Sequence, residues 1–327
     1  MATPDLIPID AAGLLLTDWC PARCRHCYVR AGPQGRAWMS VDAAAAHLAA
    51  LARMGVPPAG IHVGGGEPFG DFERLLAVVR SARQAGLAGI GYVETNGFWA
   101  ESADLVRRRL AALAGAGMIQ LSISADPYHQ EFIPPGRVQL LYDAAREVLG
   151  PRGVRVRRWK WLRNAKDVSA MPQDERRALF ADFLRRYPER MTGRAAELLA
   201  PLAPRRRIGE LPDEGCRSAL LESRHVHVDP RGWINPGTCA GIVFGRATAD
   251  QPLDGVLASG RLDRSPLIAL LVEGGPKRLL AEANRHGFEV DPQGYAGKCH
   301  LCWAVRSHLV RAGQGGDELG PEALYIM

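Results

Sequence analysis

The alternation of short apolar runs with amphipathic stretches between about residues 13 and 190 most constrains the fold of this chain. The apolar runs predict strands over 13–19, 60–63, 89–95, 118–124 and 154–162. The amphipathic stretches predict helices over 41–54, 72–85, 102–116, 137–149 and 174–187. Strands separated by such helices form a parallel sheet with the helices outside it. Five or six units are too few for an eightfold barrel, so we expect an α/β fold, a partial TIM-like (β/α)6 barrel.

The pattern changes after about residue 201, where prolines, glycines and arginines predict a linker. Alternating residues over 225–235 then predict a β-hairpin with its turn at 229–232. Two short helical stretches, 267–271 and 278–286, precede a pair of cysteines. We therefore expect a core domain over 1–205 and a small α+β domain with a β-hairpin over 206–327.

Composition excludes several classes of protein. No apolar run approaches the ~18 residues of a membrane span, and the N-terminus has neither the basic segment nor the apolar core of a secretory signal. The net charge is +6, but no basic tail or aromatic-interleaved basic stripe predicts a nucleic-acid partner. We expect a cytoplasmic protein without a membrane or nucleic-acid partner.

The chain has seven cysteines, an odd number that in a reducing compartment indicates metal-binding or catalytic thiols. Cys20, Cys24 and Cys27 follow the first predicted strand with the spacing CxxxCxxC. Three thiolates so spaced can hold a cuboidal iron–sulfur cluster and leave one iron open to a ligand. A zinc loop is the alternative, and His26 is the only nearby candidate for its fourth ligand.

A glycine-rich segment, Gly64-Gly65-Gly66-Glu67-Pro68, ends the second predicted strand. Glycines allow a ligand to approach the backbone, and a carboxylate can accept hydrogen bonds from an ammonium group. A tight loop between strand and helix would also explain the glycines. Because this segment and the cysteine loop both follow strand ends, a shared ligand site is the stronger interpretation.

The cysteine triad, the GGGEP segment and the strand–helix repeat together resemble the radical S-adenosylmethionine (SAM) superfamily, over about the first 200 residues. The resemblance implies that the three cysteines bind a [4Fe-4S] cluster whose open iron chelates the amino and carboxylate groups of SAM. It also implies that Gly65, Gly66 and Glu67 hold the methionine ammonium. Reductive cleavage of SAM would then give a 5′-deoxyadenosyl radical that abstracts hydrogen from an unactivated C–H bond.

Softer matches extend the resemblance to further cofactor contacts. His26 stands where the family usually has a bulky hydrophobe against adenine, and an imidazole can also stack there. Thr95 and Asn96 belong to a TNG segment that many members place near SAM. Ser124 belongs to the Ser-x-Asp pattern that is common at the end of the fourth strand.

Asp126 and His129 form an acid–base pair at the rim, where α/β barrels bind ligands. We expect them to contact the substrate; solvated loop residues are the alternative. In the fifth predicted strand, alternation points Arg155, Arg157, Trp159 and Trp161 into the barrel. We expect Arg157 to bind the SAM carboxylate, the alternative being an edge strand that faces water. Residues 193–195, Gly-Arg-Ala, resemble a stretch at the sixth strand of related enzymes.

The other four cysteines are Cys216, Cys239, Cys299 and Cys302. Their order resembles the twitch domain, a shortened form of the SPASM domain. The resemblance implies a second, auxiliary [4Fe-4S] cluster with four thiolate ligands, which is better suited to moving an electron than to binding a reactant. Structural zinc is the alternative, because thiolates bind both metals.

Both sites together use all seven cysteines, so no thiol is left to return a hydrogen atom to a substrate radical. This favours oxidation of a polar natural-product precursor, such as a sugar or aminocyclitol, with a reducing partner such as flavodoxin or ferredoxin. A ribosomal-peptide maturase is the first alternative, although only about a dozen residues precede the first strand, too few for a peptide-recognition domain. A radical epimerase and a zinc-stabilised binding module are the others.

Overall fold

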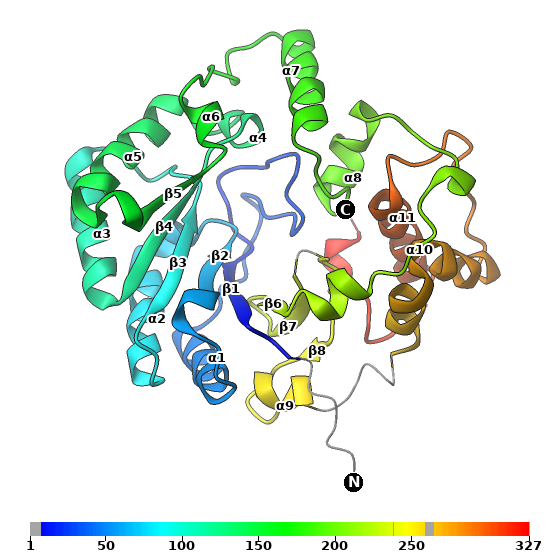
Figure 1. Cartoon of the computed structure of the whole chain (residues 1–327), viewed down its shortest axis with the longest axis horizontal. Coiled ribbons are helices and arrows are strands. Elements are labelled where there is room, and N and C mark those ends of the chain that lie inside the picture. The colour runs from blue at the N-terminus through cyan, green and yellow to red at the C-terminus, as the bar shows by residue number, and fades with distance from the viewer. Residues whose placement is uncertain (1–7, 238, 259–264, 327) are drawn as a thin grey trace.

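One eight-stranded sheet organises the computed structural model, which describes residues 8–237, 239–258 and 265–326 (Figure 1). The strand order is β5-β4-β3-β2-β1-β6-β7-β8. Strands β1 to β5 are parallel, and β6 is parallel to β1 on its other edge. Only β7 and β8 are antiparallel to their neighbours. The sheet does not close, which confirms the predicted α/β class and partial TIM-like barrel.

The first half of the chain alternates strands and helices as the sequence predicts. The strands are β1 (Ala11–Thr17), β2 (Ile61–Gly65), β3 (Ile90–Thr95), β4 (Met118–Ser124) and β5 (Val154–Arg157). The long helices are α1 (Val41–Arg53), α2 (Phe72–Gln84), α3 (Ala103–Ala116), α5 (Pro135–Leu149) and α7 (Gln173–Arg186). Three short helices, α4 (Pro127–Gln130), α6 (Trp159–Leu162) and α8 (Arg194–Leu198), lie near the carboxyl ends of the strands.

Local chemistry explains why these elements begin where they do. The side chains of Ser40, Asp71 and Ser102 cap α1, α2 and α3 by accepting a hydrogen bond from a backbone N–H in the first turn. Apolar residues of the sheet, such as Leu14 and Val63, are fully buried in one core cluster with apolar residues of these helices. The opposite, concave face of the sheet is left for polar side chains.

Two predicted strand segments are wrong. Strand β5 ends at Arg157, because Arg158 adopts a left-handed conformation (φ 64°) and α6 follows. Trp159 and Trp161 therefore lie on a helical turn and not on an inward-facing strand. Residues 193–195 form no strand either, because α8 begins at Arg194.

The last third of the chain contains β6 (His225–Val228), β7 (Trp233–Pro236), β8 (Gly245–Arg246), α9 (Leu253–Ala258), α10 (Pro266–Arg285) and α11 (Lys298–Arg311). The predicted hairpin is confirmed: β6 and β7 pair, and the N–H of Gly232 donates to the carbonyl of Asp229 (3.0 Å). Its first strand extends the main sheet at β1, so the hairpin is continuous with the N-terminal strands. The break of α10 at Gly275 (φ 66°) separates the two predicted helical stretches.

Among the described residues, no helix has both the length and the apolar character needed to cross a membrane. Residues 1–7, where the sequence predicts no secretory signal, lie outside the described residues.

Candidate active site

A cavity of about 370 Å³ lies at the carboxyl ends of the parallel strands, where α/β barrels bind ligands. Most of the predicted site residues from the first half of the chain line it. They are Cys20, Cys24, His26, Cys27, Gly65, Gly66, Thr95, Asn96, Ser124, His129 and Arg157. Two others, Glu67 and Asp126, lie behind this lining and hold its residues in place. Segments far apart in the sequence thus meet at one cavity.

The cysteine loop presents its three thiols to this cavity. Cys20 and Cys24 are buried, and Cys27 is half-buried. Burial, together with the nearby Glu67, raises the pKa of Cys20 to about 12. Burial and the other two thiols raise the pKa of Cys24 well above its ordinary value. Three thiols on one loop, all facing one cavity, suit a bound cation that would stabilise their thiolate forms.

Arg194 fixes the backbone of the cysteine loop, a role that the sequence reasoning missed. Its buried guanidinium donates to the carbonyl of Cys24 (2.9 Å) and to that of Ala31 (2.8 Å). The preceding Gly193 has φ 57°, and a Cβ there would come within 2.4 Å of the carbonyl oxygen of Tyr28. The Gly-Arg-Ala segment was the sequence signal that could have indicated this role, and its contacts stabilise the cysteine loop.

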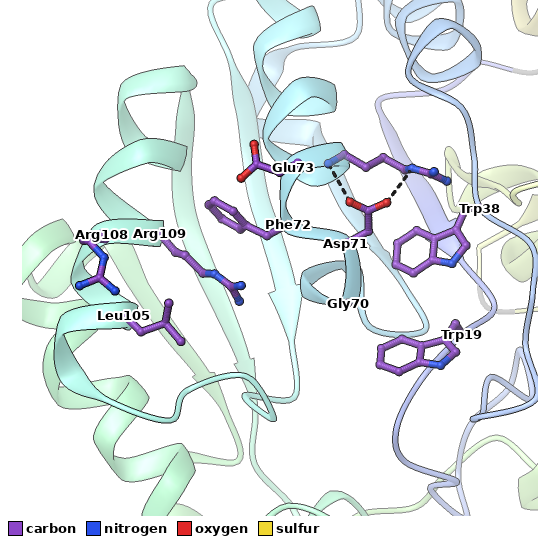
Figure 2. Close-up of a pocket in the computed structure, with 10 residues that line it drawn as sticks. Trp19, Trp38, Gly70, Asp71, Phe72, Glu73, Leu105, Arg108 and Arg109 are labelled. Atoms are coloured by element: carbon purple, nitrogen blue, oxygen red, sulfur yellow. Dashed lines mark hydrogen bonds and ion pairs between the residues drawn. The ribbon is translucent and has the colours of Figure 1, made fainter.

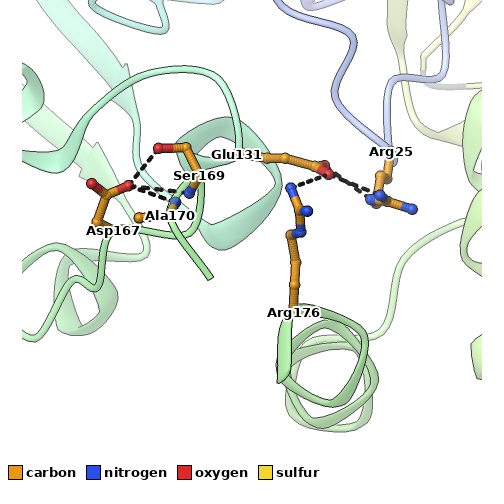
Figure 3. A network of polar contacts seen from close by, with 6 residues as sticks. All are labelled: Arg25, Glu131, Asp167, Ser169, Ala170 and Arg176. Atoms are coloured by element: carbon orange, nitrogen blue, oxygen red, sulfur yellow. Dashed lines mark hydrogen bonds and ion pairs between the residues drawn. The ribbon is translucent and has the colours of Figure 1, made fainter. Parts of the chain in front are cut away.

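A second clamp holds the same loop from the side of α7 (Figure 3). Arg25, within the cysteine loop, binds Glu131 through two hydrogen bonds (2.9 and 2.8 Å). Arg176 of α7 donates to the same carboxylate (3.4 Å). The side chain of Glu131 is 9% exposed, so this bidentate pair is a firm anchor.

The glycine-rich segment packs directly against the cysteine loop. The N–H of Gly66 donates to the carbonyl of Thr17 (2.7 Å), and the N–H of Glu67 donates to that of Trp19 (2.8 Å). A Cβ at Gly66 would lie 2.0 Å from the Trp19 oxygen, so no larger residue fits. The glycines therefore bring the end of β2 against the residue before Cys20.

Glu67 joins the ends of β2 and β3. It is fully buried, and it accepts hydrogen bonds from the Thr95 hydroxyl (2.9 Å) and the Asn96 N–H (2.7 Å). The Asn96 amide in turn donates to the sulfur of Cys20 (3.5 Å). Burial raises the pKa of Glu67 to about 7. Its observed contacts position Thr95 and Asn96, while its predicted contact with a methionine ammonium stays a prediction.

Asp126, His129 and His26 form a compact group at one wall of the cavity. The Nδ1 of His129 lies 2.8 Å from Oδ2 of Asp126, and the Nε2 of His26 lies 4.0 Å from the same oxygen. Burial alone would raise the pKa of Asp126, but its electrostatic interaction and hydrogen bonds with His129 hold it below the ordinary value. Burial lowers the pKa of His26 to about 3. Asp126 is therefore an anion that orients His129.

One tyrosine and four charged residues that the sequence reasoning gave no role complete the wall: Tyr28, Glu94, Arg158, Glu189 and Arg190. Arg157 lines the cavity from β5, which is an edge strand of the sheet, and its side chain is exposed. Its contact with the SAM carboxylate stays a prediction. Burial raises the pKa of Glu94 and raises that of Glu189 to about 6, and nearby arginines oppose both shifts. The cavity is suited to a polar ligand.

The four remaining cysteines gather at a second site. Cys299 and Cys302 lie on the first turn of α11, Cys239 follows β7, and Cys216 precedes a short helical turn. Burial raises the pKa of Cys216 to about 12, and its electrostatic interactions with the other three thiols add to this shift. The four thiols therefore lie near one another, and their binding of one cluster stays a prediction.

Arg190 connects the two sites. It lines the active-site cavity, and its guanidinium donates to the sulfur of Cys239 (3.2 Å). The buried Arg306 also lies near Cys239 and Cys302 and donates to the carbonyl of Ala240 (2.9 Å). Cationic groups next to the thiols favour their deprotonated form, which metals bind.

A wider hollow of about 800 Å³ is lined by Trp19 and Trp38 and by residues of the α2 and α3 region (Figure 2). Trp19, directly before Cys20, stacks on Trp38 there with ring centroids 6.4 Å apart. Residues of α2, of α3 and of the turn before α2 form the rest of its lining, and Arg74 pairs with Asp71 (3.2 Å). It holds none of the predicted site residues.

Of the comparisons with known proteins, one gives a match to a family. The model of the radical SAM superfamily matches residues 14–170. A search of the curated proteins found no match. Among solved structures, BtrN in complex with AdoMet and 2-DOIA is similar at 15% identity and TM-score 0.49, covering 83% of this chain and 89% of that one. SeMet BtrN in an open conformation is similar at 12% identity and TM-score 0.44, covering 83% and 88%.

Proposed function

Because residues 14–170 of this chain form a radical SAM domain, we propose that it is a radical SAM oxidoreductase that oxidises a polar small molecule by two electrons. The observation that carries the proposal is the convergence of the CxxxCxxC thiols, the glycine-rich turn and the Asp126–His129 pair on one cavity. Each of these features alone has a simpler explanation. Together they surround one cavity with thiol ligands for a metal, a backbone segment that a ligand can approach closely, and an acid–base pair.

The residues present fit the cofactors that the family implies. Three thiols on a clamped loop, with no fourth cysteine among them, suit a [4Fe-4S] cluster with one open iron. When bound, the cluster and SAM supply a 5′-deoxyadenosyl radical that takes a hydrogen atom from a C–H bond. The residues that would bind SAM are Gly65, Gly66, Thr95, Asn96, Ser124, Arg157 and His26.

His129 is the residue that we propose to accept a proton. Its Nδ1 faces the Asp126 carboxylate and therefore carries a hydrogen, which leaves the lone pair of the neutral ring on Nε2. Oxidation of an alcohol to a carbonyl removes a hydrogen atom from carbon, a proton from oxygen and one further electron. His129 would hold that proton, and Asp126 would stabilise the resulting imidazolium.

The chemistry of the wall favours a polar substrate. Glu94, Glu189 and Arg158 face the same cavity as His129. Carboxylates and guanidinium groups can hydrogen-bond to the polar groups of a sugar or an aminocyclitol. An apolar side chain in the cavity would bury the carboxylates and the guanidinium without hydrogen-bond partners. This supports a sugar or an aminocyclitol over the side chain of a ribosomal peptide.

The second cysteine site supports oxidation over epimerisation. Cys216, Cys239, Cys299 and Cys302 would hold an auxiliary [4Fe-4S] cluster, which when bound would accept the remaining electron. Arg190 links this site to the cavity directly. We further propose a reducing partner, such as flavodoxin or ferredoxin, for the first cluster.

Anaerobic reconstitution tests the proposal. We expect two clusters' worth of iron and sulfide per chain, and SAM cleavage that requires Cys20, Cys24 and Cys27. In heavy water, a two-electron oxidation gives a product without solvent deuterium at carbon, whereas an epimerase gives product with it. Zinc in place of iron at the C-terminal cysteines would overturn the oxidation proposal but not the radical SAM assignment.

A further inference from the structure

Three histidines that the proposed function does not use meet on the concave face of the sheet. His62 lies on β2, and His225 and His227 lie on β6, the first strand of the hairpin. Strand β1 runs between them, and its Gly13 is paired with His62 on one side and with His227 on the other. Side chains in this register share one face of a sheet.

Gly13 provides the space in which the rings meet. A Cβ at this position would lie 2.4 Å from Nε2 of His62 and 2.3 Å from Cδ2 of His227, closer than any side chain could tolerate. The glycine has no need of an unusual backbone conformation, since it lies within a regular strand. Its lack of a side chain allows the two imidazoles to reach each other across β1.

The distance between the rings matches a metal site. The Nε2 atoms of His62 and His227 are 3.3 Å apart. Two nitrogen ligands at 2.0–2.1 Å from a tetrahedral ion lie about 3.3–3.4 Å apart. One ligand nitrogen from each of the three histidines lies within 4.8 Å of the other two.

Apart from the contact between the His62 and His227 rings themselves, the hydrogen bonds leave ring nitrogens free for a ligand. The carbonyl of Gly237 accepts the Nδ1–H of His227 (2.5 Å), which leaves the lone pair of the neutral ring on Nε2. A carbonyl partner on the far nitrogen is the usual second contact of a metal-binding histidine. The Nε2 of His225 is buried and has no hydrogen-bond partner.

The electrostatic surroundings keep the rings neutral. Burial lowers the pKa of His227 to about 4 and also lowers the pKa values of His62 and His225. The Tyr92 ring stacks on His62, with centroids 4.7 Å apart, and Arg155 of β5 lies 4.8 Å from the centroid of the Tyr92 ring. Because β3 carries Tyr92 between β5 and β2, the tyrosine lies between the guanidinium and the histidines.

We propose that His62, His225 and His227 bind one divalent transition-metal ion, of the kind that prefers imidazole ligands, such as Zn²⁺. A neutral three-nitrogen set selects such ions over Mg²⁺ and Ca²⁺, which prefer oxygen. The site is separate from both cysteine sites and does not depend on the proposed function. By joining β2 to β6 across β1, the ion fastens the C-terminal hairpin to the N-terminal strands.

The experiment uses the full chain with its cysteine sites loaded with iron and sulfide. After addition of Zn²⁺ and removal of excess by a chelator of known affinity, we expect one equivalent of zinc per chain. X-ray absorption at the zinc edge should show nitrogen ligands at about 2.0 Å and no sulfur near 2.3 Å. The zinc-loaded protein should also have a higher Tm than the zinc-free protein.

Variants separate this site from adventitious binding. H227Q and H225Q should each weaken zinc binding by at least about tenfold, with iron content unchanged. H47Q removes another buried histidine, on α1, and should bind zinc as the parent does. G13A keeps all three histidines and should lose zinc because the methyl group keeps their rings apart. Equal zinc in the parent and H225Q, or a sulfur shell at the zinc edge, would overturn the proposal.

Discussion

The two cysteine sites differ in how the chain builds them. Cys20, Cys24 and Cys27 lie on one short loop, which Arg194 and Glu131 hold from outside. Cys216, Cys239, Cys299 and Cys302 come from three separate segments and meet only because a hairpin and α11 fold together. A local loop can present three ligands and leave one position open, whereas an assembled site surrounds its contents. The first arrangement suits a reactive centre and the second a closed one.

The largest expected effect is that single cysteine substitutions at the two sites differ in their effect on SAM cleavage. Cys24→Ala should abolish SAM cleavage and reduce iron from two clusters' worth to one, because it removes one of only three ligands. Cys302→Ala should also leave one cluster, but it should retain SAM cleavage. Iron and sulfide analysis with detection of 5′-deoxyadenosine checks both. If Cys302→Ala also abolished cleavage, the sites would not be independent.

Arg194 tests the external support of the cysteine loop. Arg194→Leu leaves the buried carbonyls of Cys24 and Ala31 without donors, which should lower the free energy of unfolding by about 2–4 kcal/mol. Chemical denaturation measures the change. Arg23→Leu, at an exposed arginine of the same loop, is the matched control and should change the stability little. Equal losses from both variants would contradict the buttressing role.

Glu67 tests the link from β2 to the cysteine loop through its pH dependence. Its folded-state pKa of about 7 lies above the ordinary 4.5, so the folded protein retains a proton that the unfolded chain releases. Its contribution to stability is therefore complete below about pH 4.5 and declines as the pH rises to about 7. Glu67→Gln should flatten the change in Tm over this window.

The exposed Glu101→Gln serves as the control for that experiment and should leave the pH dependence as it is. If the Tm of Glu67→Gln changed with pH as the Tm of the parent does, another group would account for the pH dependence.

Arg190 gives the smallest expected effect, at the junction of the two sites. Arg190→Gln removes a cation that donates to the sulfur of Cys239, so the reduction potential of a cluster held there should become more negative. Redox titration followed by electron paramagnetic resonance measures the potential. Arg158→Gln removes a charge from the same cavity wall and should leave that potential nearly unchanged. Equal shifts would show that Arg190 acts only through the overall charge.

Much of the fold and site could be predicted because the signals are local. Helix caps such as Ser40 and the apolar runs set the elements, and β4 has the predicted bounds Met118–Ser124. The carboxyl ends of parallel strands share an edge, so residues after each strand converge on one cavity. The end of β5 was missed because the left-handed Arg158 is not visible in an alternating pattern.

The contacts that depend on tertiary structure could not be predicted. Arg194 meets the cysteine loop from a segment about 170 residues away, and no spacing rule connects an arginine with a distant carbonyl. The neighbour of the hairpin was also undetermined, because an apolar strand can pair at any free edge of a sheet.

The sequence by itself determined the order of strands and helices, the three-plus-four division of the cysteines and the residues at the strand ends, because each depends on neighbours in the chain. Only the tertiary structure decided that β6 joins β1. That pairing places Gly13 between His62 and His227 and brings the C-terminal third against the N-terminal strands. The physical reason is that strand pairing is a choice among edges with similar local chemistry, which the packing of the whole chain resolves.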